Sequence, residues 1–337
     1  MIHRALSDVN ISNLMRNVAM YQKKNPIIGV GACLVGSKVR YNGESKRKNQ
    51  HIERLSGHLN LQAFCPEIAI GMGVPRETVR LVGDLGAERL MDSATQSLDY
   101  TDPMRDYARS VMEKNPEMAG YILVKGSPSC GFERVKRYND KGNAVLNDSV
   151  GTFAAELRRL DPLLPCEEDG RLNDAGLREN FVNRVFAYHQ WKEFSAGSVD
   201  HHGLIEFWSH YKYLLMSHHV PTYKEIGRLL SDSSVTSIHK TAKQFITLLM
   251  TGLGHMATRK SHCNVLQHIQ GYLKRYLGPA DKSEMNTLIT QYRQGQIPLV
   301  VPITLLRHYF RLYNSGYIDR QVYMQPYPEQ LALRNLI

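Results

Sequence analysis

The hydrophobic pattern of this 337-residue chain changes near residue 200, and that change constrains the fold more than any other feature. Before it, apolar runs alternate with amphipathic segments; the runs lie within residues 26–36, 58–73, 77–84 and 120–128. Each contains a stretch short enough for a buried strand, with glycine or proline close by. Strands alternating with helices predict an α/β fold, with a Rossmann-like, mostly parallel sheet and helices on both faces.

After residue 204 the apolar positions recur at helical spacing, so the sequence predicts a separate all-helical domain. We therefore expect four parts, which are an N-terminal extension over 1–25, an α/β domain over 26–195, a linker over 196–204 and a basic helical domain over 205–337. Within the α/β domain, a helix is expected to start near residue 150, with Asp148 or Ser149 as its N-cap.

The composition is that of a folded protein, with 42% hydrophobic and 22% charged residues. No apolar run approaches the roughly 18–20 residues needed to span a bilayer. Residues 1–26 also lack the apolar stretch of a secretory signal. We expect a cytoplasmic protein that does not bind a membrane.

Positive charge is concentrated in the predicted helical domain. Residues 201–337 hold 15 Lys and Arg against 7 Asp and Glu, so they carry +8 of the formal net charge of +10. An excess of positive charge on one domain favours nucleic acid or another polyanion as the partner.

Three of the five cysteines fall at the ends of predicted strands. Cys33 and Cys65 end the first and second strands, and Cys130 lies just past the fourth. Because parallel strands end at one edge of a sheet, where ligand sites form, these thiols are expected to converge. Cys166 and Cys263 lack this context and are expected to be incidental. An odd number of cysteines in a reducing compartment argues against a disulfide framework.

Spacing alone leaves three interpretations of the converging thiols open. A structural zinc site normally has a fourth protein ligand and closely spaced ligand pairs, which are not found here. A [4Fe–4S] cluster with three cysteine ligands leaves one iron open as a Lewis acid for a sulfur-containing substrate. Unrelated core cysteines are the third interpretation, because free cysteine is among the most buried residue types.

Four segments resemble the thiouracil desulfidase family (TudS-like, domain of unknown function 523). They read "GVGACLVGSKVRYNGESKRKN", "LNLQAFCPEIAIGMGVPRETVRLVG", "YILVKGSPSCGFERVKRY" and "EEDGRLND". The segment "HYKYLLMSHHVPTYKEIGRLL" resembles the YbgA-like helical domain of unknown function 1722. The tandem arrangement resembles the tRNA 4-thiouridine desulfidases (RudS-like), and the two matches together cover about residues 26–337.

The resemblance implies a [4Fe–4S] cluster held by Cys33, Cys65 and Cys130, whose open iron takes the thiocarbonyl sulfur of a thiolated uracil. Water then replaces sulfur at C4 of 4-thiouridine in tRNA, which gives uridine and hydrosulfide with no electron consumed. At the position of Cys166 the family has a hydrophobic residue, which supports leaving this cysteine out of the ligand set.

Water needs a general base to become a good nucleophile. Glu44 is the candidate, because an Asn-Gly turn would project it toward the end of the first strand and the family match supports it; the alternative is an ordinary loop carboxylate. The hydroxyl of Ser127, slightly favoured, or of Ser129 could bond sulfur or the ring, or relay a proton, although Ser-Pro-Ser is also a routine strand exit. Asn42 and Glu67 are weaker candidates, for substrate contact and for support of the site.

Phosphate contacts by Lys and Arg would hold a tRNA, and the target nucleotide would have to be exposed. The candidates lie at the rim, after the last site cysteine and in the helical domain: Lys46, Arg47, Lys48, Arg134, Lys136, Arg137, Lys212, Arg259, Lys260, Lys274 and Arg275. Each alone is also an ordinary surface charge. Tyr211, Tyr213 and Tyr223 could stack on bases but are expected in the core. The adjacent His218 and His219 point in different directions on a helix, so they do not form a metal pair.

Other functions fit the sequence less well. A sulfur-inserting RNA thiolase would need an ATP-binding phosphate loop, and neither a Ser-Gly-Gly-x-Asp-Ser nor a Gly-x-x-x-x-Gly-Lys-Ser/Thr motif occurs. No Gly-x-Gly-x-x-Gly follows the first strand, which argues against a dehydrogenase. A desulfidase of free thiouracil, and an RNA-binding protein with a structural cluster, are the remaining alternatives.

Overall fold

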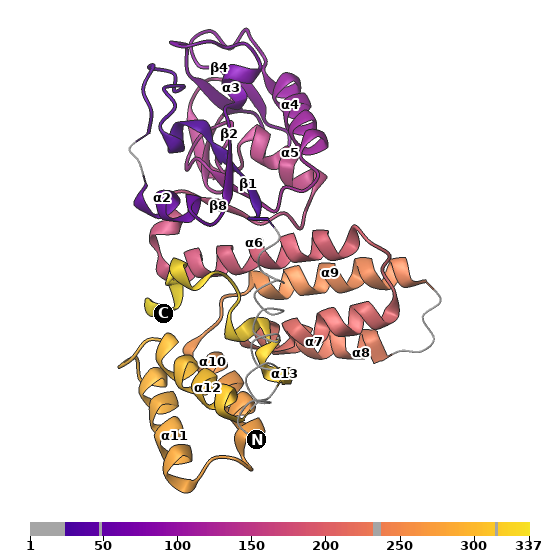
Figure 1. Cartoon of the computed structure of the whole chain (residues 1–337). Coiled ribbons are helices and arrows are strands. Elements are labelled where there is room, and N and C mark those ends of the chain that lie inside the picture. The colour runs from indigo at the N-terminus through magenta and orange to yellow at the C-terminus, as the bar shows by residue number, and fades with distance from the viewer. Residues whose placement is uncertain (1–23, 47–48, 232–236, 314–315) are drawn as a thin grey trace. The chain divides into compact units, whose positions relative to one another are not determined.

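The computed structural model describes residues 24–46, 49–231, 237–313 and 316–337, and these form two compact units (Figure 1). The α/β unit consists of Pro26–Phe181 and Tyr188–Lys192, and the helical unit includes Val182–Ala187 and Glu193–Ile337. Helix α6 (Ala175–Ser195) contributes residues to both units. Nearly all of the predicted N-terminal extension lies outside the described residues. Over the described ranges, no helix is both long enough and apolar enough to cross a membrane.

The first sheet of the α/β unit is entirely parallel, with the strand order β2-β1-β5-β8. Its strands are β1 (Ile27–Gly31), β2 (Asn60–Phe64), β5 (Gly120–Leu123) and β8 (Cys166–Glu168). The central strand β1 pairs with β2 on one side and with β5 on the other. The predicted α/β class with a parallel sheet is therefore confirmed, and three of the four predicted runs supply its strands.

A second sheet, which the sequence analysis did not anticipate, has the order β4-β3-β6-β7. Its strands are β3 (Val79–Val82), β4 (Arg89–Asp92), β6 (Val135–Tyr138) and β7 (Ala144–Ser149). Pairing is parallel between β3 and β6 and antiparallel in the two outer pairs. The third predicted run, 77–84, thus belongs to this sheet as β3. Strand β7 is exposed along most of its length and carries no pattern typical of a buried strand.

Aromatic side chains pack the helices onto the parallel sheet. Tyr121 of β5 is fully buried and contacts Phe153 of helix α5 (Thr152–Leu160) edge-on, with 5.6 Å between ring centroids. The same ring lies over Gly29 of β1, where an added Cβ atom would be 2.3 Å from ring carbons. A side chain at position 29 would therefore force the two central strands apart or displace the ring.

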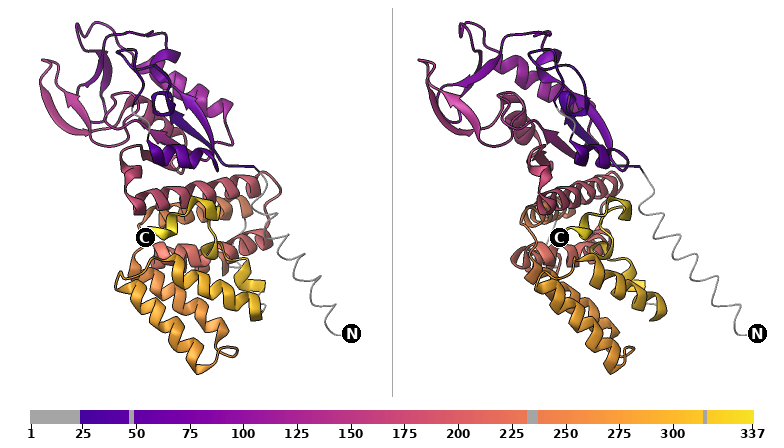
Figure 2. Two further views of the ribbon diagram at one scale, coloured as in Figure 1. Left: turned by 60° about the vertical axis from the view of Figure 1, so that its left-hand side comes forward. Right: turned by 90° about the vertical axis from the view of Figure 1, so that its left-hand side faces the viewer.

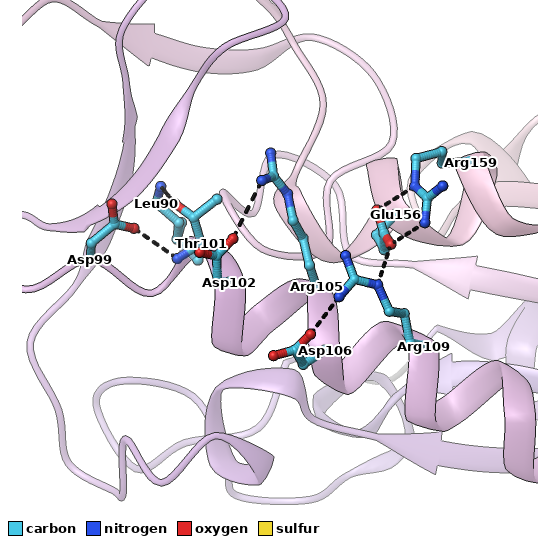
Figure 3. Close-up of polar contacts among 9 residues, drawn as sticks. All are labelled: Leu90, Asp99, Thr101, Asp102, Arg105, Asp106, Arg109, Glu156 and Arg159. Atoms are coloured by element: carbon cyan, nitrogen blue, oxygen red, sulfur yellow. Dashed lines mark hydrogen bonds and ion pairs between the residues drawn. The ribbon is translucent and has the colours of Figure 1, made fainter.

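Helices α4 (Thr101–Lys114) and α5 lie side by side and share a buried carboxylate (Figures 1 and 3). Glu156 of α5 accepts hydrogen bonds from Arg109 Nε at 3.0 Å and from Arg159 Nε at 2.9 Å. The hydrogen bonds from Arg159, and then from Arg109, hold the pKa of Glu156 below its ordinary value, against the opposing effect of burial. At the other end of α4, Thr101 Oγ1 accepts a hydrogen bond from the Leu90 amide (Figure 3).

Replacing this carboxylate is expected to loosen the contact between α4 and α5. We predict that Glu156→Gln lowers local stability by about 1–2 kcal/mol at neutral pH, because three charge-assisted hydrogen bonds from Arg109 and Arg159 weaken. Since the folded-state pKa of Glu156 is depressed, this contribution is present above the ordinary carboxyl pKa and is lost as pH falls through the folded value. Hydrogen-exchange mass spectrometry of α4 and α5 peptides measures the loss.

Asp106→Asn is the matched control for this prediction, because Asp106 also pairs with Arg109 but its side chain is 68% exposed. Exposed pairs of this kind contribute little. Equal exchange protection in wild type and Glu156→Gln would contradict the assignment.

The helical unit confirms the predicted change to helical structure, and no strand occurs in its described residues (Figure 2). Its helices are α7 (His201–His218), α8 (Val220–Ser231), α9 (Ile238–Gly254), α10 (Arg259–Gln270), α11 (Pro279–Arg293), α12 (Val300–Tyr313) and α13 (Gly316–Asp319). Helix α7 begins inside the predicted linker of 196–204, because the Asp200 side chain caps it by accepting a hydrogen bond from the Gly203 amide at 2.7 Å.

The helical unit shows where the tyrosines and the adjacent histidines singled out in the sequence lie. Tyr211 and Tyr213 are 1% and 5% exposed, so they belong to the core, as expected. His218 Nδ1 lies 2.7 Å from the His255 carbonyl oxygen, whereas the ring of His219 stacks on that of His255. The two histidines thus contact the same residue in different ways, His218 through the carbonyl of His255 and His219 through its ring.

Candidate active site

Three cysteines from the ends of neighbouring parallel strands line one cavity of about 290 Å³. Cys33 lies in the 3-10 helix η1 (Ala32–Val35) that follows β1, and Cys65 follows β2 directly as the N-cap of α3 (Pro66–Ala69). Cys130 lies in the loop after β5. Because β2, β1 and β5 are adjacent and parallel, their carboxyl ends meet at one edge of the sheet.

The remaining walls of the cavity mix apolar side chains with a few charged ones. The lining residues are Gly31, Ala32, Cys33, Val39, Arg40, Tyr41, Lys46, Phe64, Cys65, Pro66, Glu67, Arg76, Glu77, Thr78, Val79, Val124, Lys125, Gly126, Ser127, Pro128 and Cys130. Cys166 lies in β8 and Cys263 in α10, and neither lines the cavity. A small apolar cavity with a few convergent polar groups is typical of a ligand site.

The loop that carries Cys130 is organised by Ser127. Ser127 Oγ accepts hydrogen bonds from the amides of Cys130 and Ser129, at 3.1 and 3.3 Å, and the Ser127 carbonyl accepts one from the Gly131 amide at 2.7 Å. A Cβ atom at Gly131 would lie 2.7 Å from that carbonyl oxygen, so the turn needs glycine there. The local sequence therefore fixes where the Cys130 thiol points.

Helix α5 holds the same loop from its N-terminus. The Thr152 and Phe153 amides donate to the carbonyls of Pro128 and Ser129, at 3.0 and 2.9 Å. These carbonyls satisfy amides that would otherwise need a capping side chain. The predicted N-cap at Asp148 or Ser149 is therefore wrong: the helix starts after Gly151, whose side chain cannot cap, and Ser149 ends β7 instead.

Two buried carboxylates support the site, and the sequence analysis assigned them no role. Glu168 is the last residue of β8, the strand next to β5, and Asp169 follows it. Glu168 Oε1 accepts hydrogen bonds from the amides of Phe132 and Glu133, at 2.9 and 3.2 Å. Asp169 accepts one from the Lys125 amide at 2.9 Å and forms an ion pair with Lys46 at 2.8 Å. The two carboxylates thus tie both ends of the Cys130 loop to the sheet edge.

Glu67 is the acidic side chain nearest to a site thiol. Cys65 Sγ donates a hydrogen bond to Glu67 Oε2 at 3.4 Å, and Arg76 Nη2 lies 3.9 Å from the same oxygen. Arg76 is itself fixed by donating to the Val39 and Gly73 carbonyls, at 2.9 and 3.0 Å. A carboxylate in this position can accept a proton at the cavity wall. In the sequence, the Cys-Pro-Glu order is the one signal that points to this role.

The surroundings disfavour negative charge on the bare thiols. Burial, and then the charge of Glu67, raise the pKa of Cys65 to about 11. The same two causes, in the same order, raise the pKa of Cys33 and raise that of Cys130 well above its ordinary value. Thiolates at this site therefore need a compensating cation, which a metal supplies when it binds.

The donor set fits a cluster better than a single ion. Within the described ranges, no three His, Cys, Asp or Glu side chains are gathered closely enough to hold one metal ion. In an iron–sulfur cluster each thiolate binds a different iron, so its cysteines are spread more widely. Ser129 Oγ and the Tyr121 hydroxyl are buried near Cys130 and have no hydrogen-bond partner among the described residues. Buried hydroxyls normally have an acceptor, and sulfide or thiolate sulfur would provide one.

Two protein-family profiles match this chain, and one of them covers the cavity. The profile of the 2-thiouracil desulfurase family matches residues 28–169, and that of a family of unknown function, DUF1722, matches residues 212–328. The chain joins a 2-thiouracil desulfurase domain to a DUF1722 domain. The resemblance of the two parts to the thiouracil desulfidase family and to the YbgA-like domain is therefore confirmed, and the cavity lies within the matched part of the desulfurase domain.

Two individual proteins are similar to parts of the chain. The uncharacterized protein YbgA of Escherichia coli K12 is 28% identical over 156 residues, which cover 45% of this chain and 90% of YbgA. The solved structure of the [4Fe-4S]-dependent thiouracil desulfidase TudS is 29% identical and covers 46% of this chain and 98% of its own, with a TM-score of 0.38.

Not all predicted residues of the desulfurase domain lie at the cavity. Ser127 and Lys46 line it, whereas Ser129 is fully buried behind the loop. Glu44 is exposed and accepts a hydrogen bond from Asn42 Nδ2 at 2.9 Å, and neither side chain is among the described residues that line the cavity. The Asn-Gly turn therefore directs Glu44 toward solvent and Asn42, rather than toward the thiols.

The basic residues predicted to contact phosphate are likewise not all placed where they could do so. Arg134 and Lys136 are exposed beyond the Cys130 loop. Arg137, by contrast, is 9% exposed and makes paired hydrogen bonds to Asp148, so it has a structural role. Lys212 lies in the DUF1722 domain against aromatic rings. Arg47 and Lys48 lie outside the described residues.

The tight turn at Gly131 yields a test of the site that does not depend on activity. We predict that Gly131→Ala displaces the Ser127 carbonyl, breaks the turn and lowers the iron content of the anaerobically reconstituted protein several-fold. Gly57→Ala is the control, because Gly57 has helical dihedral angles and an added Cβ atom would lie 3.8 Å from the nearest atom. Full iron content in Gly131→Ala would show that the Cys130 loop does not hold metal.

Proposed function

We propose that the chain is an iron–sulfur-dependent desulfidase that removes sulfur from 4-thiouridine in tRNA, giving uridine and hydrosulfide. The observation that carries the proposal is the cavity that three cysteines from adjacent strand ends line together with Glu67, the carboxylate bonded to Cys65, within a domain that matches the 2-thiouracil desulfurase family. Desulfuration of a thiolated uracil is the chemistry that the family name describes, and 4-thiouridine in tRNA is our more specific choice of substrate.

Cys33, Cys65 and Cys130 would hold a [4Fe–4S] cluster at the base of the cavity. When bound, such a cluster with one open iron supplies a Lewis acid that polarises a carbon–sulfur double bond. The protein's contribution is to hold the three thiolates apart on separate strand ends and to keep one side of the site open toward the cavity.

Glu67 is the side chain that we assign to proton transfer. Its carboxylate would take one proton from water as the water oxygen bonds to C4 of the thiolated ring. The second water proton then passes to the sulfur as the C4–S bond breaks, so that sulfur leaves as hydrosulfide and C4 keeps the oxygen as a carbonyl. Carbon exchanges sulfur for oxygen at constant oxidation state, so no electrons are consumed. Arg76, which lies beside Glu67 and is anchored on two carbonyls, orients the carboxylate.

Ser127 is suited to hydrogen bonding with the substrate. Its oxygen already accepts from two backbone amides, so its own hydrogen is the part left to donate toward the cavity that it lines. A hydroxyl donor there would bond to the sulfur or to the ring of the bound base. Lys46, held by Asp169 at the rim, would meet the negative charge of a nucleotide rather than of a free base.

We choose tRNA over a free thiobase as the substrate because of the positive charge of residues 201–337. A cavity of about 290 Å³ admits a single base, so a nucleotide of a folded RNA would have to be turned out to reach it. A free base, however, would not need the net charge of +8 carried by residues 201–337. Positive charge of this kind gives most of the affinity for RNA.

The proposal is tested by incubating the anaerobically reconstituted protein with 4-thiouridine-containing tRNA and following the loss of the thiouridine absorbance and the release of sulfide. We predict turnover by wild type, no turnover and reduced iron in Cys33→Ala, Cys65→Ala and Cys130→Ala, and retained iron in the control Cys166→Ala. Free 4-thiouracil is assayed in parallel, and faster turnover of the free base than of tRNA would refute the tRNA assignment.

Two carboxylates give opposite predictions for the same assay. Glu67→Gln is expected to lower the rate about 100-fold or more while iron content is retained, because general-base catalysis is lost but no ligand is removed. Glu44→Gln is the matched control and is expected to change the rate little, since Glu44 faces solvent and Asn42. The reverse pattern would restore Glu44 as the base predicted from the sequence.

A further inference from the structure

Four tyrosines form two stacked pairs on the helical unit. Tyr272 and Tyr317 stack with 5.7 Å between ring centroids, and Tyr276 and Tyr313 with 5.3 Å. Tyr272 belongs to the short 3-10 helix η3 (Gly271–Leu273), which packs against α12. We call these four residues the tyrosine ladder.

The tyrosine ladder is more exposed than internal packing requires. Tyr272 is 42% exposed and Tyr276 56% exposed, so their rings present large aromatic faces to solvent. A hydrogen bond from the Tyr213 hydroxyl to the Tyr272 hydroxyl, at 3.0 Å, fixes one end of the ladder to the buried helix α7. Tyr272 and Tyr276 are thus exposed rings, each stacked on a half-buried partner ring, and Tyr272 is also fixed by a hydrogen bond. This arrangement is expected of a preorganised stacking surface.

Positive charge accompanies these rings. Lys212 Nζ lies 5.0 Å from the centroid of the Tyr317 ring, so the cation sits at the edge of the ladder. Lys274 and Arg275 are both exposed and lie in the chain between Tyr272 and Tyr276. One acidic residue of α13, Asp319, lies nearby in the chain and is followed directly by Arg320.

Exposed aromatic faces interleaved with Lys and Arg match the chemistry of single-stranded nucleic acid. Bases stack on tyrosine rings whatever their sequence, and the intervening phosphates pair with the cations. An acidic or apolar protein partner would use only one half of this surface, either the cations or the rings. The combination therefore points to unpaired nucleotides of an RNA.

We propose that the tyrosine ladder, together with Lys212, Lys274 and Arg275, is a binding surface for unpaired bases of RNA. The proposal rests on the function proposed above, because it identifies where the RNA that carries the substrate is held. Lys212, Lys274 and Arg275 were already candidates for phosphate contact in the sequence analysis, whereas the four tyrosines were not.

The test is the binding of a fluorescein-labelled single-stranded RNA of mixed sequence, free of thiolated bases, to the full-length, reconstituted protein, measured by fluorescence anisotropy. Tyr276→Ala is expected to weaken binding about ten-fold, the usual effect of removing one stacking ring. Tyr276→Phe keeps the ring and is expected to bind within two-fold of wild type. Equal affinity of Tyr276→Ala and wild type, or the absence of RNA binding by wild type, would overturn the proposal.

A second pair of variants separates this surface from general positive charge. Lys274→Ala combined with Arg275→Ala is expected to reduce the slope of log affinity against log salt by about 1.4, since two phosphate contacts are lost. Lys240→Ala combined with Lys243→Ala removes the same charge from exposed positions of α9 and is expected to leave the slope unchanged. Equal slopes for the two double variants would contradict the assignment. Because the probe undergoes no turnover, the result is independent of whether the protein desulfurates.

Discussion

The pairing of β1 with β2 on one side and β5 on the other is the interaction on which the site depends. Parallel pairing brings the ends of these three strands to one edge, and each strand end is followed at once by a cysteine-bearing turn or loop. The close approach of β1 and β5 requires glycine at position 29, where the Tyr121 ring occupies the space of a side chain. The spacing of the thiols is therefore set by the backbone of the sheet and not by any local motif.

The second constraint is electrostatic. The buried thiol of Cys130, the half-buried thiols of Cys33 and Cys65 and the carboxylate of Glu67 share one cavity, and each negative charge there raises the cost of the next. The hydrogen bond of the Ser127 side chain to Cys130 opposes this by lowering the pKa of that thiol, although burial and nearby negative charge outweigh it. The amides of Ser129 and Cys130 hold the Ser127 hydroxyl in place. Such a site is stable as a set of thiolates only with a bound cation, and the two buried hydroxyls near Cys130 add donors for sulfur.

Much of this site could be predicted from the sequence, because it follows from a rule about parallel strands. The convergence of Cys33, Cys65 and Cys130 needed only strand positions and the common edge. The place of Glu44 could not be predicted, since the direction of a side chain after an Asn-Gly turn depends on its hydrogen bond to Asn42. Glu67 was only a weaker candidate in the sequence analysis, because it lies on a helix of four residues, which is too short to show a helical hydrophobic pattern.

The errors elsewhere have a similar cause. The cap of α5 comes from carbonyls of a loop 24 residues earlier in the chain, so no local side chain had to supply it. The second sheet contains a polar edge strand and one short apolar run, and neither shows which sheet it joins. In the helical unit, periodicity predicted the helices correctly but could not identify the tyrosine ladder, because its stacked pairs join η3 and the turn after it to the end of α12 and to α13.

The central claim is that this cavity replaces sulfur by water-derived oxygen without electron transfer. The most direct measurement is mass spectrometry of the uridine formed from 4-thiouridine-containing tRNA in ¹⁸O-labelled water, with no reductant present and with sulfide measured in the same sample. The account predicts one ¹⁸O atom in each uridine formed and one sulfide released for each uridine. Uridine without the label, or a reaction that proceeds only when a reductant is added, would contradict it.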